Sequence, residues 1–247
     1  MYILASDFDN TLYFNGSFHQ EDLEAIKRFQ NTGHKFGVCT GRQLNGITMP
    51  SIGYDISYDF YITCSGAMVL DKHQHIIFEK TIPYHFVKEI NQKINAWISI
   101  SSDNKVYVCG TNKKLPKDLG TKINSLNDLK IKEVTDFNFH FKSSELKEAK
   151  LCCDYINTYY QDYMIAFQNN EHVDVAPVNC SKGNGLKFME KYYMSQKTIA
   201  IGDSWNDITM LDAASMAYCF DYSPKELKKK ADMIVHSVNE CINDILQ

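Results

Sequence analysis

Short apolar runs alternate with amphipathic stretches over the first third of the chain. Residues 2–5 are apolar and open directly from the terminus, which predicts a buried strand. Residues 19–31 place Leu23, Ile26 and Phe29 at helical spacing and are followed by a glycine, which predicts a helix. The other elements predicted in this part are strands over 35–40 and 60–64, and a hairpin formed by 67–70 and 76–79 around a polar turn.

The pattern changes at Pro83 and changes back at Pro177. Between these prolines the expected elements are helices over 85–98 and 144–160 and strands over 105–109, 137–141, 164–168 and 172–175. After Pro177 strand and helix alternate again, with helices over 185–193, 207–214 and 225–231 and strands over 198–201, 216–220 and 233–235. We therefore predict an α/β core, a doubly wound parallel sheet formed by residues 1–82 and 177–247, with an α+β domain inserted as residues 83–176.

Composition narrows the class of protein. The 247 residues are 44% hydrophobic and 23% charged, as in an average globular protein, which excludes a disordered chain or a coiled-coil rod. The net charge of −4 disfavours a nucleic-acid partner. No apolar stretch approaches the roughly 20 residues of a membrane span, and no signal peptide is expected.

The eight cysteines form no CxxC pair, so we expect reduced, buried thiols in a cytoplasmic protein. The sequence predicts no particular oligomeric state.

Two carboxylates follow the first predicted strand. Asp7 and Asp9 are two residues apart, so on an extended chain both side chains point the same way. Such a pair could share a metal ion and divide the roles of nucleophile and general acid/base. A DxD pair also arises by chance, but here an apolar strand leads into it and Thr11 follows.

A second acidic pair, Asp203 and Asp207, follows the predicted strand 198–201. Asp207 could simply cap the helix that comes next. Asp203 stands directly after a buried strand, where a carboxylate needs a partner.

Two further motifs offer groups that bind phosphate. Thr40 and Gly41 supply a hydroxyl and an approachable backbone N–H, although a plain turn or helix cap is an equally simple interpretation. Lys182 stands just before a predicted helix. Ligands of open parallel α/β sheets bind at the carboxyl ends of the strands, where Asp7, Asp9, Thr40 and Asp203 all fall. Carboxylates, a hydroxyl and an amine at one edge suit Mg²⁺-assisted phosphate chemistry.

Taken in order, SDFDNTL, CTGR, SKG and IGDSWND resemble the four motifs of the haloacid dehalogenase superfamily of phosphatases. The insertion between the second and third motifs resembles the C2 cap, and the whole chain is similar to the Cof-type, class IIB, sugar phosphatases. The resemblance implies a Mg²⁺-dependent enzyme that hydrolyses small phosphorylated metabolites, with sugar phosphates the expected substrates, through an aspartyl-phosphate.

The resemblance also implies a role for each motif residue. Asp7 would be the nucleophile and Asp9 the general acid/base. The phosphoryl group would be bound by the Phe8 backbone N–H, Thr40, Gly41, Lys182 and the side chain of Asn206. Mg²⁺ would be ligated by Asp7, the Asp9 backbone carbonyl and Asp203, with Asp207 in the outer shell. Asn10 replaces a common glycine, but asparagine tolerates left-handed backbone geometry. Ser65 and Phe220-Asp221 are further departures from the family pattern.

Two rival functions remain open. A hexose phosphate mutase must hold a second phosphate, for which arginine is the usual residue. Residues 83–176 contain no arginine, and their 12 lysines balance 12 acidic residues, which disfavours this alternative. A non-catalytic sensor of phosphorylated metabolites would be favoured by loss of Asp7 or Asp9, yet both are present.

Overall fold

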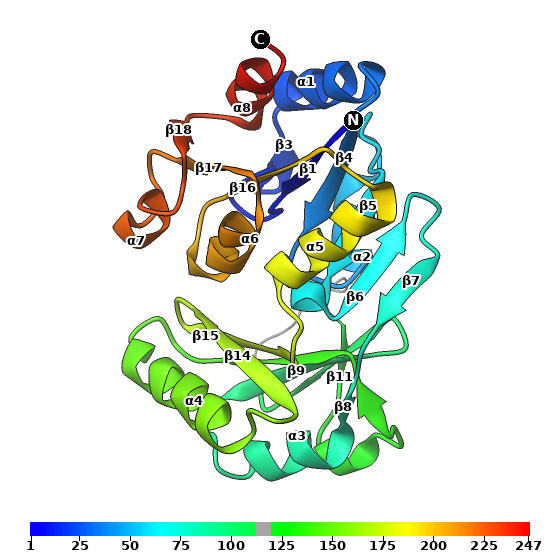
Figure 1. Ribbon diagram of the computed structural model, residues 1–247. Coiled ribbons are helices and arrows are strands. Elements are labelled where there is room, and N and C mark those ends of the chain that lie inside the picture. The colour runs from blue at the N-terminus through cyan, green and yellow to red at the C-terminus, as the bar shows by residue number, and fades with distance from the viewer. Residues whose placement is uncertain (112–119) are drawn as a thin grey trace. The chain divides into compact units, whose positions relative to one another are not determined.

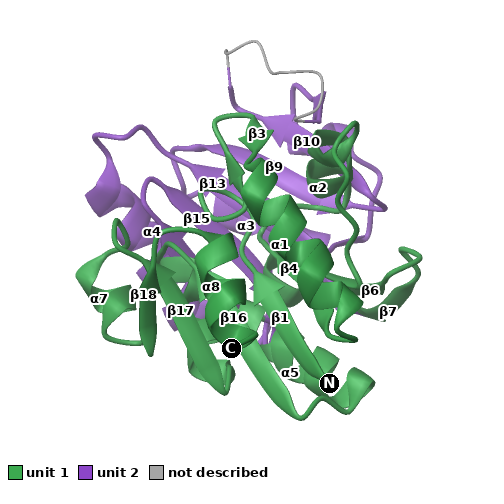
Figure 2. Cartoon of the chain, turned by 90° about the horizontal axis from the view of Figure 1, so that it is seen from above, with its two compact units in different colours: residues 1–78, 181–247 green, residues 79–180 purple. Residues whose placement is uncertain are grey.

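The computed structural model describes residues 1–111 and 120–247, and the chain divides into two compact units (Figure 1, Figure 2). Unit 1 comprises Met1–Phe78 and Ser181–Gln247, and unit 2 comprises Glu79–Cys180. The inserted domain was predicted as residues 83–176, slightly inside the bounds of unit 2.

Unit 1 is built on a sheet whose central strands are parallel. The order across the sheet is β18 (Met233–Val235), β17 (Met216–Phe220), β16 (Lys197–Gly202), β1 (Tyr2–Ser6), β4 (Lys35–Cys39), β5 (Phe60–Thr63), β6 (Met68–Asp71) and β7 (Ile76–Glu79). The six strands from β18 to β5 pair in parallel, and β6 pairs antiparallel with β5.

Helices cover both faces of this sheet because alternate strand residues point to opposite sides. Leu4 packs in a core with residues of α1 (Gln20–Asn31) and α8 (Val238–Ile245). Its neighbours Ile3 and Ala5 pack with residues of α5 (Lys182–Tyr193), α6 (Ile208–Ala213) and α7 (Lys225–Lys228). The helices of unit 1 are α1 (Gln20–Asn31), α2 (Asn45–Ser51), α5 (Lys182–Tyr193), α6 (Ile208–Ala213), α7 (Lys225–Lys228) and α8 (Val238–Ile245), with 3₁₀ turns η1 (Cys64–Gly66) and η3 (Trp205–Asp207) and a small hairpin of β2 (Tyr13–Phe14) and β3 (Ser17–Phe18). The doubly wound α/β fold is confirmed.

Unit 2 has a sheet that is antiparallel except where β11 (Thr121–Lys122) pairs in parallel with β10 (Lys105–Cys109), and its two helices pack on one face. Phe137, Phe139, Ile98 and Ile100 pack against apolar residues of both helices, as the alternation along β9 and β13 requires. The sheet order is β11 (Thr121–Lys122), β10 (Lys105–Cys109), β9 (Trp97–Ser102), β13 (Asp136–His140), β15 (His172–Pro177) and β14 (Met164–Asn169). The helices are α3 (Tyr84–Asn91) and α4 (Leu146–Tyr159), and the small elements are η2 (Leu126–Asp128) and the pair β8 (Ile82–Pro83) and β12 (Glu133–Val134).

One predicted element is wrong in its second half. The helix expected over 85–98 ends at Asn91, and Trp97 begins β9, which pairs with both β10 and β13. Residues Ile98–Ser101 alternate between apolar and polar, a strand period whose first residue the helix prediction included. The helices α2 and α8 were not predicted at all.

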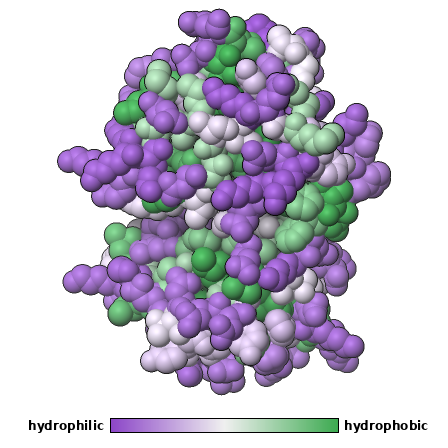
Figure 3. All heavy atoms as spheres, viewed as in Figure 1, coloured by the Kyte–Doolittle hydropathy of each residue, from purple (hydrophilic) through white to green (hydrophobic). Residues whose placement is uncertain are grey.

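The surface and the cysteines add two observations. On the face drawn in Figure 3, hydrophilic side chains surround smaller groups of apolar ones. No helix within residues 1–111 and 120–247 is long and apolar enough to cross a membrane. All eight cysteines are free and buried, as expected for thiols that pack as small apolar side chains.

Candidate active site

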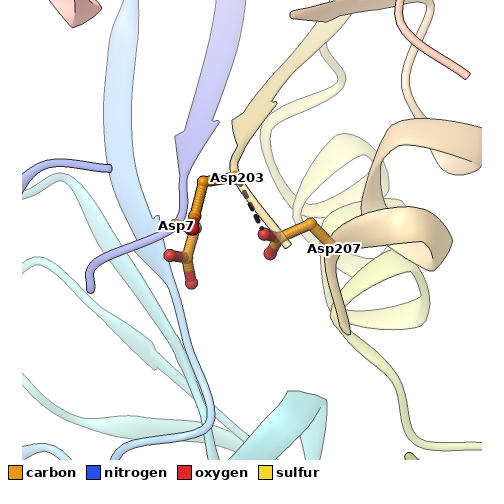
Figure 4. Close-up of side chains that lie close together, drawn as sticks. All are labelled: Asp7, Asp203 and Asp207. Atoms are coloured by element: carbon orange, nitrogen blue, oxygen red, sulfur yellow. Dashed lines mark hydrogen bonds between the residues drawn. The ribbon is translucent and has the colours of Figure 1, made fainter. Parts of the chain in front are cut away.

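Three carboxylates meet at the carboxyl edge of the unit 1 sheet (Figure 4). Asp7 follows β1, and Asp203 follows the neighbouring strand β16. Asp207 closes η3, the turn after β16. One oxygen of each carboxylate lies within 4.8 Å of the others. Because β1 and β16 are parallel neighbours, their ends bring together residues almost 200 positions apart in the sequence. This is the convergence that the motif positions predicted.

Lys182 lies within this cluster. Its Nζ is 2.5 Å from Asp7 Oδ1 and 2.6 Å from Asp207 Oδ1. Only 2% of the Lys182 residue is exposed, and it is the first residue of α5, whose N-cap is Ser181. The Ser181 hydroxyl accepts a hydrogen bond from the Asn184 N–H and so fixes the start of the helix. A lysine is seldom buried without carboxylate partners, and this one has two.

The cluster carries more negative than positive charge. Burial, followed by the charge of Asp207, raises the pKa of Asp7 well above its usual range, against the opposing effect of Lys182. Burial and the same Asp207 charge raise the pKa of Asp203 to about 6. Burial alone would lower the pKa of Lys182, but Asp207 and Asp7 outweigh it and raise that pKa. With one ammonium beside three carboxylates, the cluster has a surplus of negative charge that a further cation could balance.

Asp207 uses both of its oxygens within the protein. Oδ1 accepts from Lys182, and Oδ2 accepts from the backbone N–H groups of Asp203 and Ser204, both at 3.0 Å. Asp207 therefore caps η3 and also belongs to the acidic cluster, so the two interpretations of this residue hold together. Position 202 requires a glycine, because a Cβ there would lie 2.5 Å from the Asp207 carboxyl carbon.

Thr40 and Thr11 each lie in a loop that follows a strand of the unit 1 sheet. Thr40 follows β4, the other neighbour of β1, and its Oγ1 accepts from the backbone N–H of Arg42 at 3.1 Å. Gly41, between them, is partly exposed. Thr11 was not predicted as a site residue, although its Oγ1 donates to Asp203 Oδ1 at 3.1 Å. Its only sequence signal was its position in the first motif.

The first motif forms a tight loop after β1. Phe8 is fully buried, and its carbonyl oxygen accepts from the backbone N–H of Leu12 and of Tyr13. Asn10 adopts φ 57°, the left-handed geometry that an asparagine tolerates. The hydroxyl of Tyr222 donates to the Asn10 carbonyl oxygen at 2.6 Å, a contact that the sequence did not suggest.

Asp9 lies outside the three-carboxylate cluster. Its carboxylate accepts from Arg42 Nε and Nη2 at 2.7 and 2.6 Å, and 48% of its side chain is exposed. Nothing in the sequence assigned a role to Arg42. The side chain of Asn206 lies on η3, where its Oδ1 accepts from the Ser204 hydroxyl at 2.7 Å. The predicted roles of Asp9 and Asn206 stay predictions.

The donor atoms of the cluster suit a hard divalent cation. Asp7 and Asp203 offer carboxylate oxygens, and no histidine or cysteine belongs to any metal-sized group in the described ranges 1–111 and 120–247. Carboxylate oxygens with a surplus of negative charge are the ligands that Mg²⁺ and similar ions take. The residues present therefore fit such an ion.

The fold and the site together define an α/β enzyme whose acidic and basic groups gather at the carboxyl edge of a parallel sheet. The chain belongs to the haloacid dehalogenase-like hydrolase family, whose model matches residues 4–245. The predicted superfamily and the expectation of an enzyme are confirmed.

Individual proteins show the same likeness. The chain is 29% identical over 244 residues to a protein of Buchnera aphidicola subsp. Baizongia pistaciae named "Putative phosphatase", covering 92% of this chain and 89% of that protein. It is 24% identical to the stress response protein YhaX of Bacillus subtilis, covering 96% and 89%.

Solved structures share the fold of the whole chain. The HAD subclass IIB sugar phosphatase BT4131 superposes with a TM-score of 0.82 at 21% identity, covering 100% of this chain and 98% of that one. SMU.1108c from Streptococcus mutans superposes with a TM-score of 0.85 at 19% identity, covering 99% and 98%.

Proposed function

We propose that the protein is a phosphohydrolase that depends on Mg²⁺ and cleaves small phosphorylated metabolites, sugar phosphates among them, in the cytoplasm. The observation that carries this proposal is the buried contact of Lys182 with Asp7 inside an acidic cluster at the carboxyl edge of the sheet. A carboxylate held beside a fixed cation can meet a phosphate dianion there. The similarity to a sugar phosphatase supports the substrate class.

The reaction would proceed in two displacements. In the first, a carboxylate oxygen of Asp7 attacks phosphorus, the bond from phosphorus to the ester oxygen breaks, and Asp9 gives its proton to the leaving oxygen. In the second, Asp9 takes a proton from water, the water oxygen attacks phosphorus, and the bond to Asp7 breaks. Inorganic phosphate and a regenerated Asp7 result.

Other residues of the chain would hold the phosphoryl group during both steps. Lys182, Thr40 and the Asn206 side chain would donate hydrogen bonds to its oxygens, together with the backbone N–H groups of Phe8 and Gly41. The ion would be held by Asp7, the Asp9 carbonyl oxygen and Asp203. When bound, a divalent cation offsets the charge between the Asp7 carboxylate and the incoming phosphate.

The test is turnover of p-nitrophenyl phosphate by the purified chain. We expect steady release of p-nitrophenolate with Mg²⁺, loss of that release with EDTA, and recovery when Mg²⁺ is returned. Asp7→Asn is the matched control, since an amide of the same size cannot attack phosphorus. Activity in Asp7→Asn, with deamidation excluded by mass spectrometry, would contradict the role of Asp7, and turnover in EDTA would contradict the role of the ion.

The same preparation decides between the rival functions. A panel of phosphorylated metabolites identifies the substrate, and sugar phosphates should be the best of them. A hexose 1-phosphate with a catalytic amount of the bisphosphate should yield free phosphate. Conversion to the 6-phosphate would indicate a mutase. Binding of a metabolite without any turnover would indicate a sensor.

A further inference from the structure

Arg42 binds the carboxylate of Asp9 through two nitrogens. Its Nε donates to Asp9 Oδ2 at 2.7 Å, and its Nη2 donates to Asp9 Oδ1 at 2.6 Å. Two such bonds between a planar guanidinium and a planar carboxylate fix both the position and the orientation of the carboxylate. A lysine, with its single point of charge, would fix the position alone.

The guanidinium is itself held in place. Its third nitrogen, Nη1, donates to the carbonyl oxygen of Gly46 at 2.7 Å. Its central carbon lies 5.1 Å from the ring centroid of Phe8 and 6.0 Å from that of Tyr13, distances at which a cation and an aromatic ring attract. Each of the three nitrogens thus has a partner in the protein, and two aromatic rings lie beside the group.

Asp9 needs such a partner because nothing else in the described residues holds its side chain. It follows the end of β1, is half exposed, and receives side-chain hydrogen bonds from Arg42 alone among residues 1–111 and 120–247. An unrestrained carboxylate on a loop samples several rotamers. A general acid/base must instead lie within about 2.6–3.2 Å of the atom that exchanges the proton.

We propose that Arg42 is the positioning residue of Asp9. This inference rests on the proposed function, since it assigns Arg42 to the acid/base group of that reaction. Arg42 acts through Asp9 and is not a ligand of the phosphoryl group. Three of the five N–H donors of the guanidinium bond to other groups of the protein, which favours this role over substrate binding.

The first test separates kcat from KM. In Arg42→Ala, we expect kcat for p-nitrophenyl phosphate to fall on the order of 10²-fold, the usual cost of a misplaced catalytic group, with KM unchanged or lowered. Guanidinium ion at millimolar concentration should restore part of the lost kcat in Arg42→Ala but not in Asp9→Asn. The control is Arg28→Ala, which removes the other arginine of the chain, an exposed residue of α1 bound to Asn239 and Asn243. Its kcat should equal that of the wild type.

The second test asks whether Arg42 acts through Asp9. Because both substitutions disable the same group, Arg42→Ala should cost nothing further when added to Asp9→Asn. A crystal structure of Arg42→Ala should show the Asp9 carboxylate displaced or spread over several rotamers. Arg42→Lys keeps the charge and the hydrophobic stem, so it serves as the milder variant if Arg42→Ala does not fold.

The outcomes that overturn the inference are distinct. A raised KM with unchanged kcat would make Arg42 a substrate ligand, and additive losses in the double variant would make it independent of Asp9. Wild-type kcat in both Arg42 variants would also remove the role while leaving the proposed function intact. A wild-type protein that hydrolyses no phosphate ester would overturn the proposed function, and this inference with it.

Discussion

The ammonium of Lys182 lies 2.5 Å from the carboxylate of Asp7, although 175 residues separate them in the sequence. Both groups are almost fully buried, and Asp207 is the second partner of the same nitrogen. Lys182, the first residue of α5, is thereby bound to Asp7 in the loop that follows β1. This contact makes Lys182 part of the folded core as well as of the site.

Loss of the Lys182 charge should destabilise the protein. In Lys182→Met without metal, we expect the free energy of unfolding to fall by about 3–5 kcal/mol, because Asp7 and Asp207 are left buried without their cation. Urea unfolding measures the change. Lys187→Met, on the exposed face of α5, should change it by no more than about 0.5 kcal/mol.

A double variant keeps this prediction testable if Lys182→Met alone does not fold. Asp207→Asn added to Lys182→Met removes a buried charge from each side of the contact and should recover part of the lost stability. Equal stability of Lys182→Met and the wild type would show that the contact does not stabilise the fold.

Ionisation of Asp203 should contribute a loss of stability to the metal-free protein as pH rises from 5 to 7. Burial and the charge of Asp207 raise the pKa of Asp203 to about 6 from an ordinary value of 3.8. For a carboxyl whose folded pKa is raised, the stabilisation is complete below the unfolded pKa and is lost as pH rises through the folded pKa. In EDTA we expect the wild type to lose on the order of 1–2 kcal/mol relative to Asp203→Asn over this range.

Two comparisons check the cause of this pH dependence. Stability should rise more, or fall less, between pH 5 and 7 in Asp203→Asn than in the wild type, because the carboxyl that ionises is gone. Saturating Mg²⁺ should raise the stability at pH 7 more than at pH 5, since the ion binds the ionised form. A slope that is the same in Asp203→Asn and in the wild type would contradict this prediction.

A histidine of unit 2 should make the fold sensitive to acid. Burial, with the neighbouring His172, lowers the pKa of His140 to about 3. His140 stacks on Trp97 at 3.6 Å and shares hydrogen bonds with Ser99 and His172. For a group whose folded pKa is lowered, stability is complete above the unfolded pKa, here 6.5, and is lost as pH falls toward the folded pKa.

The measurement is urea unfolding followed by tryptophan fluorescence between pH 6.5 and 4. We expect the wild type to lose roughly 1 kcal/mol more per pH unit than His140→Asn, which has no ring to protonate. His236→Asn is the control, because His236 is exposed and lies in unit 1. Identical slopes in His140→Asn and the wild type would show that His140 is protonated as readily in the folded chain as in the unfolded one.

The sequence predicts the acidic cluster well because strand ends are local features. Asp7, Thr40 and Asp203 each follow a short apolar run, and parallel strands bring such ends to one edge. The pairing of Arg42 with Asp9 has no such local signal. It depends on two loops and on the direction of both side chains, which periodicity does not encode.

For α2 and β9, the local sequence explains why the prediction failed. The helix α2 contains Gly46 and Pro50, residues that weaken a helical pattern. The strand β9 begins soon after α3 ends at Asn91, so its first two residues were predicted as the end of that helix, and residues 99–102 were assigned to no element.

The measurement that tests the proposed mechanism most directly is the reaction of Asp9→Asn with p-nitrophenyl phosphate in rapid-quench mixing. A good leaving group needs little protonation, so the first displacement should proceed, whereas attack by water should be slowed by about 10²–10⁴-fold. We expect a burst of about one equivalent of p-nitrophenolate per enzyme, a slow steady rate, and phosphate found on Asp7 by mass spectrometry of the quenched protein. Near-normal steady turnover, or a burst without phosphate on Asp7, would contradict a reaction in which Asp7 is the nucleophile and Asp9 the acid/base.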